Sequence, residues 1–331
     1  MSKWLKVGLA LLLATLSWEV LITLLAERHT GHDVDALFGV VAKPGTVFNG
    51  REGFSIERIN SHYTRGAEFD VNDASKRRIT VLGDSYTEAT QVDEDSSFVA
   101  TTQRKFVENG RTDVLMVNDG HSGKSPPYYI DTGKSWMDFL KSDFVVVQLN
   151  EGDFTSDFYS SSQDIYVKRD GDKFTTIRKP QKQGKASGYA KLSAVITRLR
   201  VVVEERSQNK SKKTKKPPVD PSFAKEALWF MHEAKAIFPH FAVLYIPTMD
   251  YHQRETLSLL PPLEVSLEAA AKAEGVPYIN MRSLYARYFL ETNQPCHGFN
   301  NTIPGTGHIN GYGHRLLGEE LYKLISPLVS K

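Results

Sequence analysis

The chain has 331 residues, of which 40% are hydrophobic, and its formal net charge at pH 7 is +2. This length supports one sizeable core with a small accessory part. The balanced charge argues against an overall preference for nucleic acid or for strongly acidic partners. The single cysteine, Cys296, cannot form an internal disulfide, and we expect an ordinary loop thiol rather than a nucleophile.

The N-terminal segment begins with Lys3 and Lys6, which precede an apolar run over residues 7–26. A run of this length can cross a bilayer as a helix, and lysines before it favour a cytoplasmic N-terminus. We therefore expect residues 1–28 to form a membrane anchor, with the rest of the chain outside the cytoplasm, in the periplasm or the extracellular space. A cleaved signal and an amphipathic surface helix stay open, the latter because Glu19 is costly inside a bilayer.

Residues 29–76 are rich in turn formers and predict an irregular lead-in with short strands. From there to the C-terminus, short apolar or β-branched runs alternate with longer amphipathic segments. We expect strands over residues 78–83, 113–119, 144–149, 240–247 and 276–280. We expect helices over residues 96–110, 125–141, 223–238 and 259–275, and a last one within residues 307–325. This alternation predicts an α/β fold, a three-layer sandwich with a mostly parallel sheet, over residues 77–331.

The alternation breaks at about residues 155–220, where we expect an insertion. Residues 164–179 predict a hairpin around Asp170 and Gly171, and residues 189–205 predict a helix. The lysine- and proline-rich residues 209–222 predict a solvated linker or loop. A basic patch for anionic lipid or polysaccharide is the alternative for this loop.

Ligands bind at the carboxyl ends of the strands in sheets of this kind, so the loops that follow the strands are the candidate site. Asp84 and Ser85 follow Gly83 at the end of the first strand. Ser85 is either a nucleophile, with backbone N–H groups nearby to stabilise a developing negative charge, or a plain helix cap.

Three further loops carry candidate residues. Gly123, after the second strand, either brings a backbone N–H close to a ligand or only permits a turn. Asn150, after the third strand, is either an oxyanion donor or part of a polar turn. His308, in a glycine-rich loop before the last helix, is placed to act as a base that takes a proton from a serine. His314, within that helix, we expect to cap or pack.

Together these loops resemble the conserved blocks of the SGNH, or GDSL-type, hydrolase family over about residues 60–325. GDSYTE resembles the nucleophile block, NDGHSGKSP the block whose glycine contributes to the oxyanion hole, and GHINGYGH the block with the general base. The resemblance implies a flavodoxin-like strand order, Ser85 as nucleophile and His308 as base. It implies an oxyanion hole from the N–H groups of Ser85 and Gly123, with help from Asn150. We expect no cofactor and no metal, because the histidines lack zinc-motif spacing.

The chain departs from the family pattern in two blocks. The family places an aspartate two or three residues before the histidine, where this chain has Thr306 and Gly305. Either a backbone carbonyl holds the histidine in a Ser–His dyad, or a distant carboxylate such as Asp250 orients it. The asparagine of the third block aligns with Gly152. Either Asn150, two residues earlier, turns in as a donor, or the oxyanion hole has only the N–H donors of Ser85 and Gly123.

We therefore expect a serine esterase or O-acetyltransferase that acts outside the cytoplasm on an acylated carbohydrate of the cell envelope, on a secreted polysaccharide, or on another ester. A transferase would need a separate membrane protein to deliver the acyl donor. The alternative is a catalytically impaired relative that binds a glycan or organises an envelope assembly, because two supporting groups are missing from their usual positions.

Overall fold

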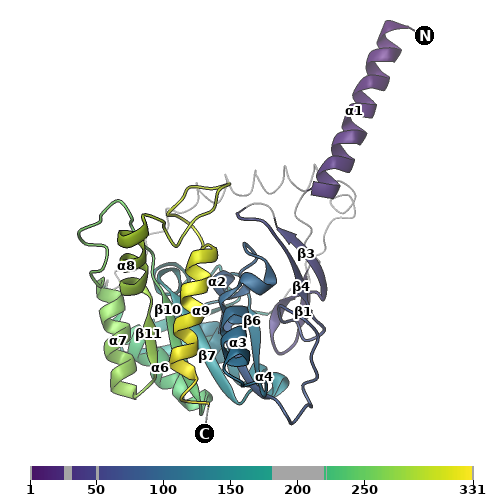
Figure 1. Ribbon diagram of the computed structural model, residues 1–331. Helices are drawn as coiled ribbons and strands as arrows, with labels where there is room; N and C mark the ends of the chain where they lie inside the picture. Colours follow the sequence, from purple (N-terminus) through teal and green to yellow (C-terminus); the bar gives the residue numbers. More distant parts are fainter. Residues whose placement is uncertain (1, 26–31, 50–51, 181–219, 221, 330–331) are drawn as a thin grey trace. The chain divides into compact units, whose positions relative to one another are not determined.

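The structure, a computed structural model, describes residues 2–25, 32–49, 52–180, 220 and 222–329 (Figure 1). The chain divides into two compact units. One comprises Met1–Arg28 and Lys182–Val219, and the other His29–Gln181 and Asp220–Lys331. The helix that the sequence predicts over residues 189–205 and most of the lysine-rich loop lie outside the described residues.

The first unit contributes one described helix, α1 (Lys3–Leu25). A membrane-spanning helix needs about 20 consecutive, predominantly apolar residues. Within the described ranges, no helix is both long enough and apolar enough to cross a membrane. The membrane anchor over residues 7–26 stays a prediction.

Five parallel strands form the central sheet of the second unit, in the order β11-β10-β7-β5-β6. They are β5 (Arg77–Gly83), β6 (Val114–Gly120), β7 (Phe144–Asn150), β10 (Phe241–Ile246) and β11 (Tyr278–Asn280). In order of appearance along the chain they are arranged 2-1-3-4-5, the flavodoxin-like order. Every residue of the central strand β7 is buried, as expected for a parallel strand covered on both faces. The expected α/β fold with a parallel sheet is confirmed.

Helices cover the two faces of this sheet (Figure 1). They are α3 (Phe98–Glu108), α4 (Pro126–Leu140), α6 (Ala224–Ile237), α7 (Pro262–Glu274), α8 (Arg282–Thr292) and α9 (Gly311–Ile325). α3 packs against α9, and α6 packs against both α4 and α7. The crossover from β5 to β6 contains α3, and the crossover from β6 to β7 contains α4. Both are right-handed and they run in opposite directions along the sheet, which places α3 and α4 on opposite faces. The sequence analysis did not anticipate α8.

Short antiparallel hairpins surround the sheet. They are β1 (His32–Asp35) with β2 (Gly39–Ala42), β3 (Gly45–Asn49) with β4 (Ser55–Ile59), and β8 (Ile165–Asp170) with β9 (Lys173–Arg178). The first two pairs are the short strands expected in the lead-in. The last pair is the hairpin predicted in the insertion, with Gly171 at a φ of 60° in its turn.

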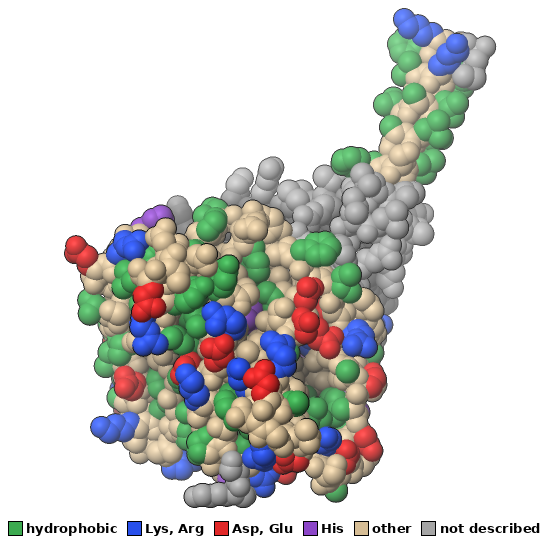
Figure 2. Space-filling model, viewed as in Figure 1, with side chains coloured by type: hydrophobic (Ala, Val, Ile, Leu, Met, Phe, Trp, Pro, Cys, Tyr) green, Lys and Arg blue, Asp and Glu red, His purple; other side chains and the backbone are tan. Residues whose placement is uncertain are grey.

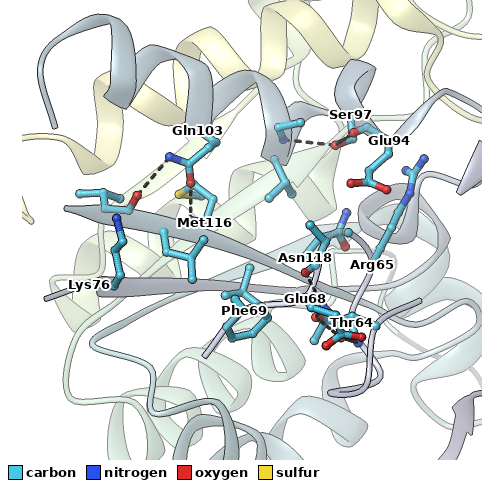
Figure 3. Close-up of a pocket in the computed structure, with 18 of the residues that line it drawn as sticks. Thr64, Arg65, Glu68, Phe69, Lys76, Glu94, Ser97, Gln103, Met116 and Asn118 are labelled. Atoms are coloured by element: carbon cyan, nitrogen blue, oxygen red, sulfur yellow. Dashed lines mark hydrogen bonds between the residues drawn. The ribbon is translucent and has the colours of Figure 1, made fainter. Parts of the chain in front are cut away.

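The edge strand β6 has its backbone groups occupied by side chains and by the lead-in. The Gln103 amide accepts a hydrogen bond from the Met116 N–H (2.8 Å) and donates one to the Val114 carbonyl (3.1 Å). The Arg65 N–H donates to the Asn118 carbonyl (3.0 Å). These groups line a cavity of about 390 Å³ between α3, β6 and the lead-in (Figure 3). An edge occupied in this way is protected from pairing with another chain.

The side chain of Arg65 fastens the lead-in to the segment after the predicted nucleophile. Its guanidinium donates to the carbonyls of Glu88 (2.8 Å), Ala89 (2.7 Å) and Val92 (2.6 Å). Glu88 is the last residue of the short helix α2 (Ser85–Glu88), and the other two residues follow it. Its Nε lies 2.8 Å from Oε2 of the buried Glu57. The lead-in is therefore a fixed part of the second unit.

The close approach of α9 to α3 gives a first prediction. At Gly318 a Cβ would lie 2.7 Å from the Phe98 carbonyl oxygen and 2.5 Å from the Thr101 Cβ. Alanine normally stabilises a helix interior by about 1 kcal/mol relative to glycine, but overpacking costs about 1–3 kcal/mol. We expect Gly318→Ala to lower the free energy of unfolding, measured by urea denaturation.

Gly311→Ala is the matched control, because a Cβ there would meet nothing within 4 Å. This variant should unfold with an unchanged or slightly higher free energy. A stabilising effect at both positions would show that the two helices do not approach closely at Gly318.

Candidate active site

The strand order reverses between β5 and β7, the usual ligand site of such sheets. The loop after β5 begins at this point, and the loop after β6 begins beside it. Gly83 pairs with Gly120 at the ends of the two strands, and the His121 N–H donates to the Gly83 carbonyl (2.9 Å). A Cβ at Gly120 would lie 2.0 Å from the Glu88 backbone nitrogen. Glycine at this position therefore lets α2 pack directly on the end of β6.

Ser85 is the first residue of α2, and the structure separates its two predicted roles. The helix is capped by Asp84, whose Oδ1 accepts the Tyr86 N–H at 3.0 Å. The Ser85 Oγ instead lies 2.8 Å from Nε2 of His308. Ser85 is thus not the side-chain cap, and its hydroxyl contacts the histidine that the sequence analysis selected as base.

His308 is held from its other side by Glu52, a residue of the lead-in. Glu52 Oε2 lies 2.5 Å from His308 Nδ1, and Oε1 accepts the His308 backbone N–H at 2.8 Å. Burial raises the pKa of Glu52, but the hydrogen bonds and charge of His308 lower it further, so that the pKa lies below its ordinary value. An ionised carboxylate favours the hydrogen on Nδ1, which leaves Nε2 as the acceptor that faces Ser85.

Two glycines and an asparagine allow Glu52 to reach the histidine. Gly53 has a φ of 70°, and its N–H and carbonyl both bond to the Asn301 amide at 2.9 Å. Gly307 has a φ of 78°, and a Cβ there would lie 2.3 Å from Glu52 Oε1. A side chain at position 307 would therefore displace the carboxylate.

The structure corrects both predictions for the partner of His308. The group at Nδ1 is neither a backbone carbonyl nor Asp250. The Asp250 carboxylate accepts hydrogen bonds from the His252 N–H (3.1 Å) and from Gln253 Nε2 (2.8 Å) within its own loop. Sequence reasoning missed Glu52, since no local pattern links the lead-in to a loop so distant along the chain.

The Asn150 side chain lies next to the nucleophile segment, although its amide is already engaged. Nδ2 donates to Asp84 Oδ2 at 2.8 Å, and Oδ1 accepts the Gly152 N–H at 2.7 Å. The Nδ2 group carries a second N–H. Asn150 is thus positioned through the residue that precedes Ser85, whereas Gly152, which aligns with the family's asparagine, offers no side chain.

Two buried carboxyl groups lie beside these residues. Asp153 Oδ2 accepts the Asn150 N–H at 2.8 Å, and Asp84 accepts the Asn150 amide. Burial raises the pKa of Asp84 to about 6 and raises the pKa of Asp153 well above its usual range. Desolvation is the main cause in both cases.

Gly123 occupies a tight turn that is tied to α2. The Lys124 N–H donates to the His121 carbonyl (3.1 Å), and Gly123 has a φ of 78°, as the third residue of a type II turn requires. The Ser122 N–H donates to Glu88 Oε2 (3.0 Å). A Cβ at Gly123 would meet nothing within 4 Å, so open space adjoins this backbone.

Two other candidates belong to the core. His314 is 1% exposed, its Nδ1 accepts the Phe98 N–H (3.2 Å), and burial lowers its pKa to about 3. Cys296 is fully buried, and burial raises its pKa to about 12, which suppresses the reactive thiolate. Across the part of the chain that the structure describes, no group of three His, Cys, Asp or Glu side chains could hold a metal ion.

Neither a protein-family model nor a curated protein matches this sequence. Solved structures similar to the chain include LAE5, an α/β hydrolase enzyme from the metagenome of Lake Arreo, Spain, with 14% identity, a TM-score of 0.45, and coverage of 77% of this chain and 97% of that one. The acetyl xylan esterase AlAXEase shows 12% identity, a TM-score of 0.45, and coverage of 74% and 98%. The lipase/acylhydrolase from Enterococcus faecalis shows 16% identity, a TM-score of 0.41, and coverage of 76% and 96%. Similarities of this size do not establish what this chain binds.

The Glu52–His308 pair predicts a pH-dependent contribution to stability. Because the pKa of Glu52 in the folded protein lies below its ordinary value of 4.5, the ionised carboxylate stabilises the fold above that pH. The contribution disappears as the pH falls through the folded-state pKa. We expect the difference in unfolding free energy between wild type and Glu52→Gln to be present at pH 7 and lost at strongly acidic pH, as measured by urea denaturation.

The same comparison in a His308→Gln background is the matched control, because the hydrogen bonds and charge of His308 lower the pKa of Glu52. In that background the pH-dependent difference should shrink. A difference for Glu52→Gln that does not change with pH would show that the Glu52 carboxylate does not interact with His308 as an ion.

Proposed function

We propose that this chain is a serine ester hydrolase in which Ser85, His308 and Glu52 form the catalytic triad. The observation that carries the proposal is the unbroken chain of contacts from Ser85 Oγ to His308 Nε2 (2.8 Å) and from His308 Nδ1 to Glu52 Oε2 (2.5 Å). Nucleophile, base and orienting acid recur in this geometry on unrelated folds, so that the geometry itself is informative.

The reaction follows from these positions. The Ser85 oxygen attacks the ester carbonyl while His308 Nε2 takes the hydroxyl proton, and the carbonyl electron pair moves onto oxygen. The imidazolium is stabilised by Glu52 and returns the proton to the alkoxide as the bond to the leaving alcohol breaks. A water molecule then repeats the sequence on the acyl-enzyme and releases the acid.

The oxyanion requires donors, for which the N–H groups of Ser85 and Gly123 are our candidates. The Gly123 turn is tied through the Ser122 N–H to the side chain of Glu88, the last residue of α2. The second N–H of Asn150 Nδ2 is the candidate third donor. One such donor typically contributes about 3 kcal/mol to transition-state stabilisation.

The substrate and the location of the enzyme extend this proposal. We infer an acyl group, most simply acetyl, on a carbohydrate of the cell envelope or on a secreted polysaccharide. Export rests on the N-terminal sequence alone, where Lys3 and Lys6 precede an apolar run, a pattern shared with secretion signals. Transfer to a sugar hydroxyl in place of water would use the same residues, together with a separate membrane protein that supplies the acyl donor.

The alternative of an impaired glycan-binding or assembly protein is now less attractive. It rested on two missing groups, the acid beside His308 and the asparagine of the third block, and the Glu52 carboxylate occupies the first of these places.

Nitrophenyl acetate hydrolysis by the purified full chain tests the triad. We expect Ser85→Ala to abolish turnover and labelling by a fluorophosphonate probe. We expect Glu52→Gln to lower kcat by roughly two to four orders of magnitude with little change in KM, because the neutral amide cannot stabilise the imidazolium. Glu68→Gln, which alters the same lead-in away from His308, should retain wild-type kcat.

Equal turnover by wild type and Ser85→Ala would exclude Ser85 as the nucleophile. A fully active Glu52→Gln would reduce the triad to a dyad.

A further inference from the structure

A second cavity, of about 320 Å³, opens at the carboxyl ends of β7, β10 and β11. Glu151 contributes to it from the loop after β7, residues 248–261 from the loop after β10, and Arg282 from the start of α8. β7 lies between β10 and β5, the strand that leads to Ser85. Two strand spacings of about 4.8 Å separate the cavity from Ser85 along the same sheet edge, or roughly 10 Å.

A tyrosine contributes to the lining of this cavity. Tyr245 is 1% exposed as a whole residue and is one of the residues that line the cavity. Burial, together with the neighbouring Glu264, Tyr278 and Glu151, raises the pKa of Tyr245, so the hydroxyl is a neutral donor. A tyrosine hydroxyl has one O–H to donate, so it can bind an acceptor oxygen of a ligand in the cavity.

Arg282 supplies a second donor from the same lining. Its side chain is 8% exposed and pairs with Glu264 through Nε (2.7 Å) and Nη2 (2.5 Å). Nη2 also donates to the Thr248 carbonyl (2.8 Å), and Nη1 to the Leu257 carbonyl (3.3 Å). A guanidinium has five N–H groups, so one on Nη1 is unused by the described residues. Because Glu264 neutralises the positive charge of Arg282, the guanidinium is suited to donate a hydrogen bond to a neutral ligand rather than to bind an anion.

The other residues that line the cavity indicate which class of ligand it suits. Glu151 and Asp250 bring two carboxylates to the cavity, while Leu257, Leu259 and Pro261 line it with apolar surface. Carboxylates repel an anionic ligand, and a long acyl chain would offer the two donors no acceptor. A sugar ring fits both conditions, because its hydroxyls donate to carboxylates and accept from Tyr245, while its C–H faces suit the apolar wall.

We propose that this cavity, hereafter the Tyr245 pocket, is a subsite for a neutral sugar ring one or two units from the ester-bearing ring of a carbohydrate substrate. The proposal rests on the proposed esterase function and adds to it a binding element for the carbohydrate chain. The Tyr245 pocket and Ser85 lie on one sheet edge, which is the arrangement that an extended oligosaccharide requires.

A variant that fills the pocket without disturbing the core tests the proposal. Leu259 is 62% exposed, so Leu259→Trp places a ring at the pocket without an expected folding cost. We expect the ratio of kcat/KM for acetylated xylotetraose to kcat/KM for nitrophenyl acetate to fall at least tenfold, mainly through KM. Leu290→Trp, at a leucine that is 46% exposed on α8, is the matched control and should leave the ratio unchanged.

Direct binding separates this proposal from the esterase proposal. Titration calorimetry with xylotetraose, mannotetraose and cellotetraose should detect binding of at least one of them to wild type, weakened at least tenfold by both Leu259→Trp and Tyr245→Phe. If wild type binds none of the three, or if Leu259→Trp binds as well as wild type, the subsite is overturned. Failure to hydrolyse nitrophenyl acetate would overturn the esterase alone, because the binding result does not depend on turnover.

Discussion

The contact between Glu52 and His308 joins residues 256 positions apart, and the arrangement of the candidate site depends on it. Both carboxylate oxygens engage the same residue, one at the ring and one at the backbone, so the loop and the imidazole are oriented together. Without this carboxylate, His308 would face Ser85 with no group to stabilise its protonated form. The lead-in thus belongs to the site and is more than a connection between the N-terminal helix and the sheet.

Several energetically unfavourable features elsewhere in the structure can be explained because they support this contact. Arg65 is buried so that its guanidinium can hold the lead-in to the carbonyls after Ser85. Gly53 and Gly307 adopt positive φ values, and Gly307 leaves room for the carboxylate. On the face of the second unit that Figure 2 presents, acidic and basic groups are intermingled.

The sheet could be predicted from the sequence because its strands are apolar runs with local boundaries, such as the fully buried β7. Ser85 and His308 could be selected because each lies in a short pattern at a strand end or helix start. Glu52 could not be selected, because an orienting acid needs only a carboxylate close to the histidine. Which carboxylate lies there depends on the fold of the whole unit. α8 is a different case: its buried residues, including Arg282, Tyr285 and Phe289, repeat at helical spacing, and this signal was available and overlooked.

The order of the three groups along the chain has a consequence for biosynthesis. A ribosome completes Glu52 before Ser85 and reaches His308 only near the end, just before α9, whose packing on α3 closes that side of the sheet. Domains generally fold as units, and the acid, the nucleophile and the base all belong to the second unit, so this unit is incomplete while the base is still unmade. A nascent or prematurely terminated chain then contains the nucleophile segment in unactivated form, and reactivity appears only when both ends of the second unit have met.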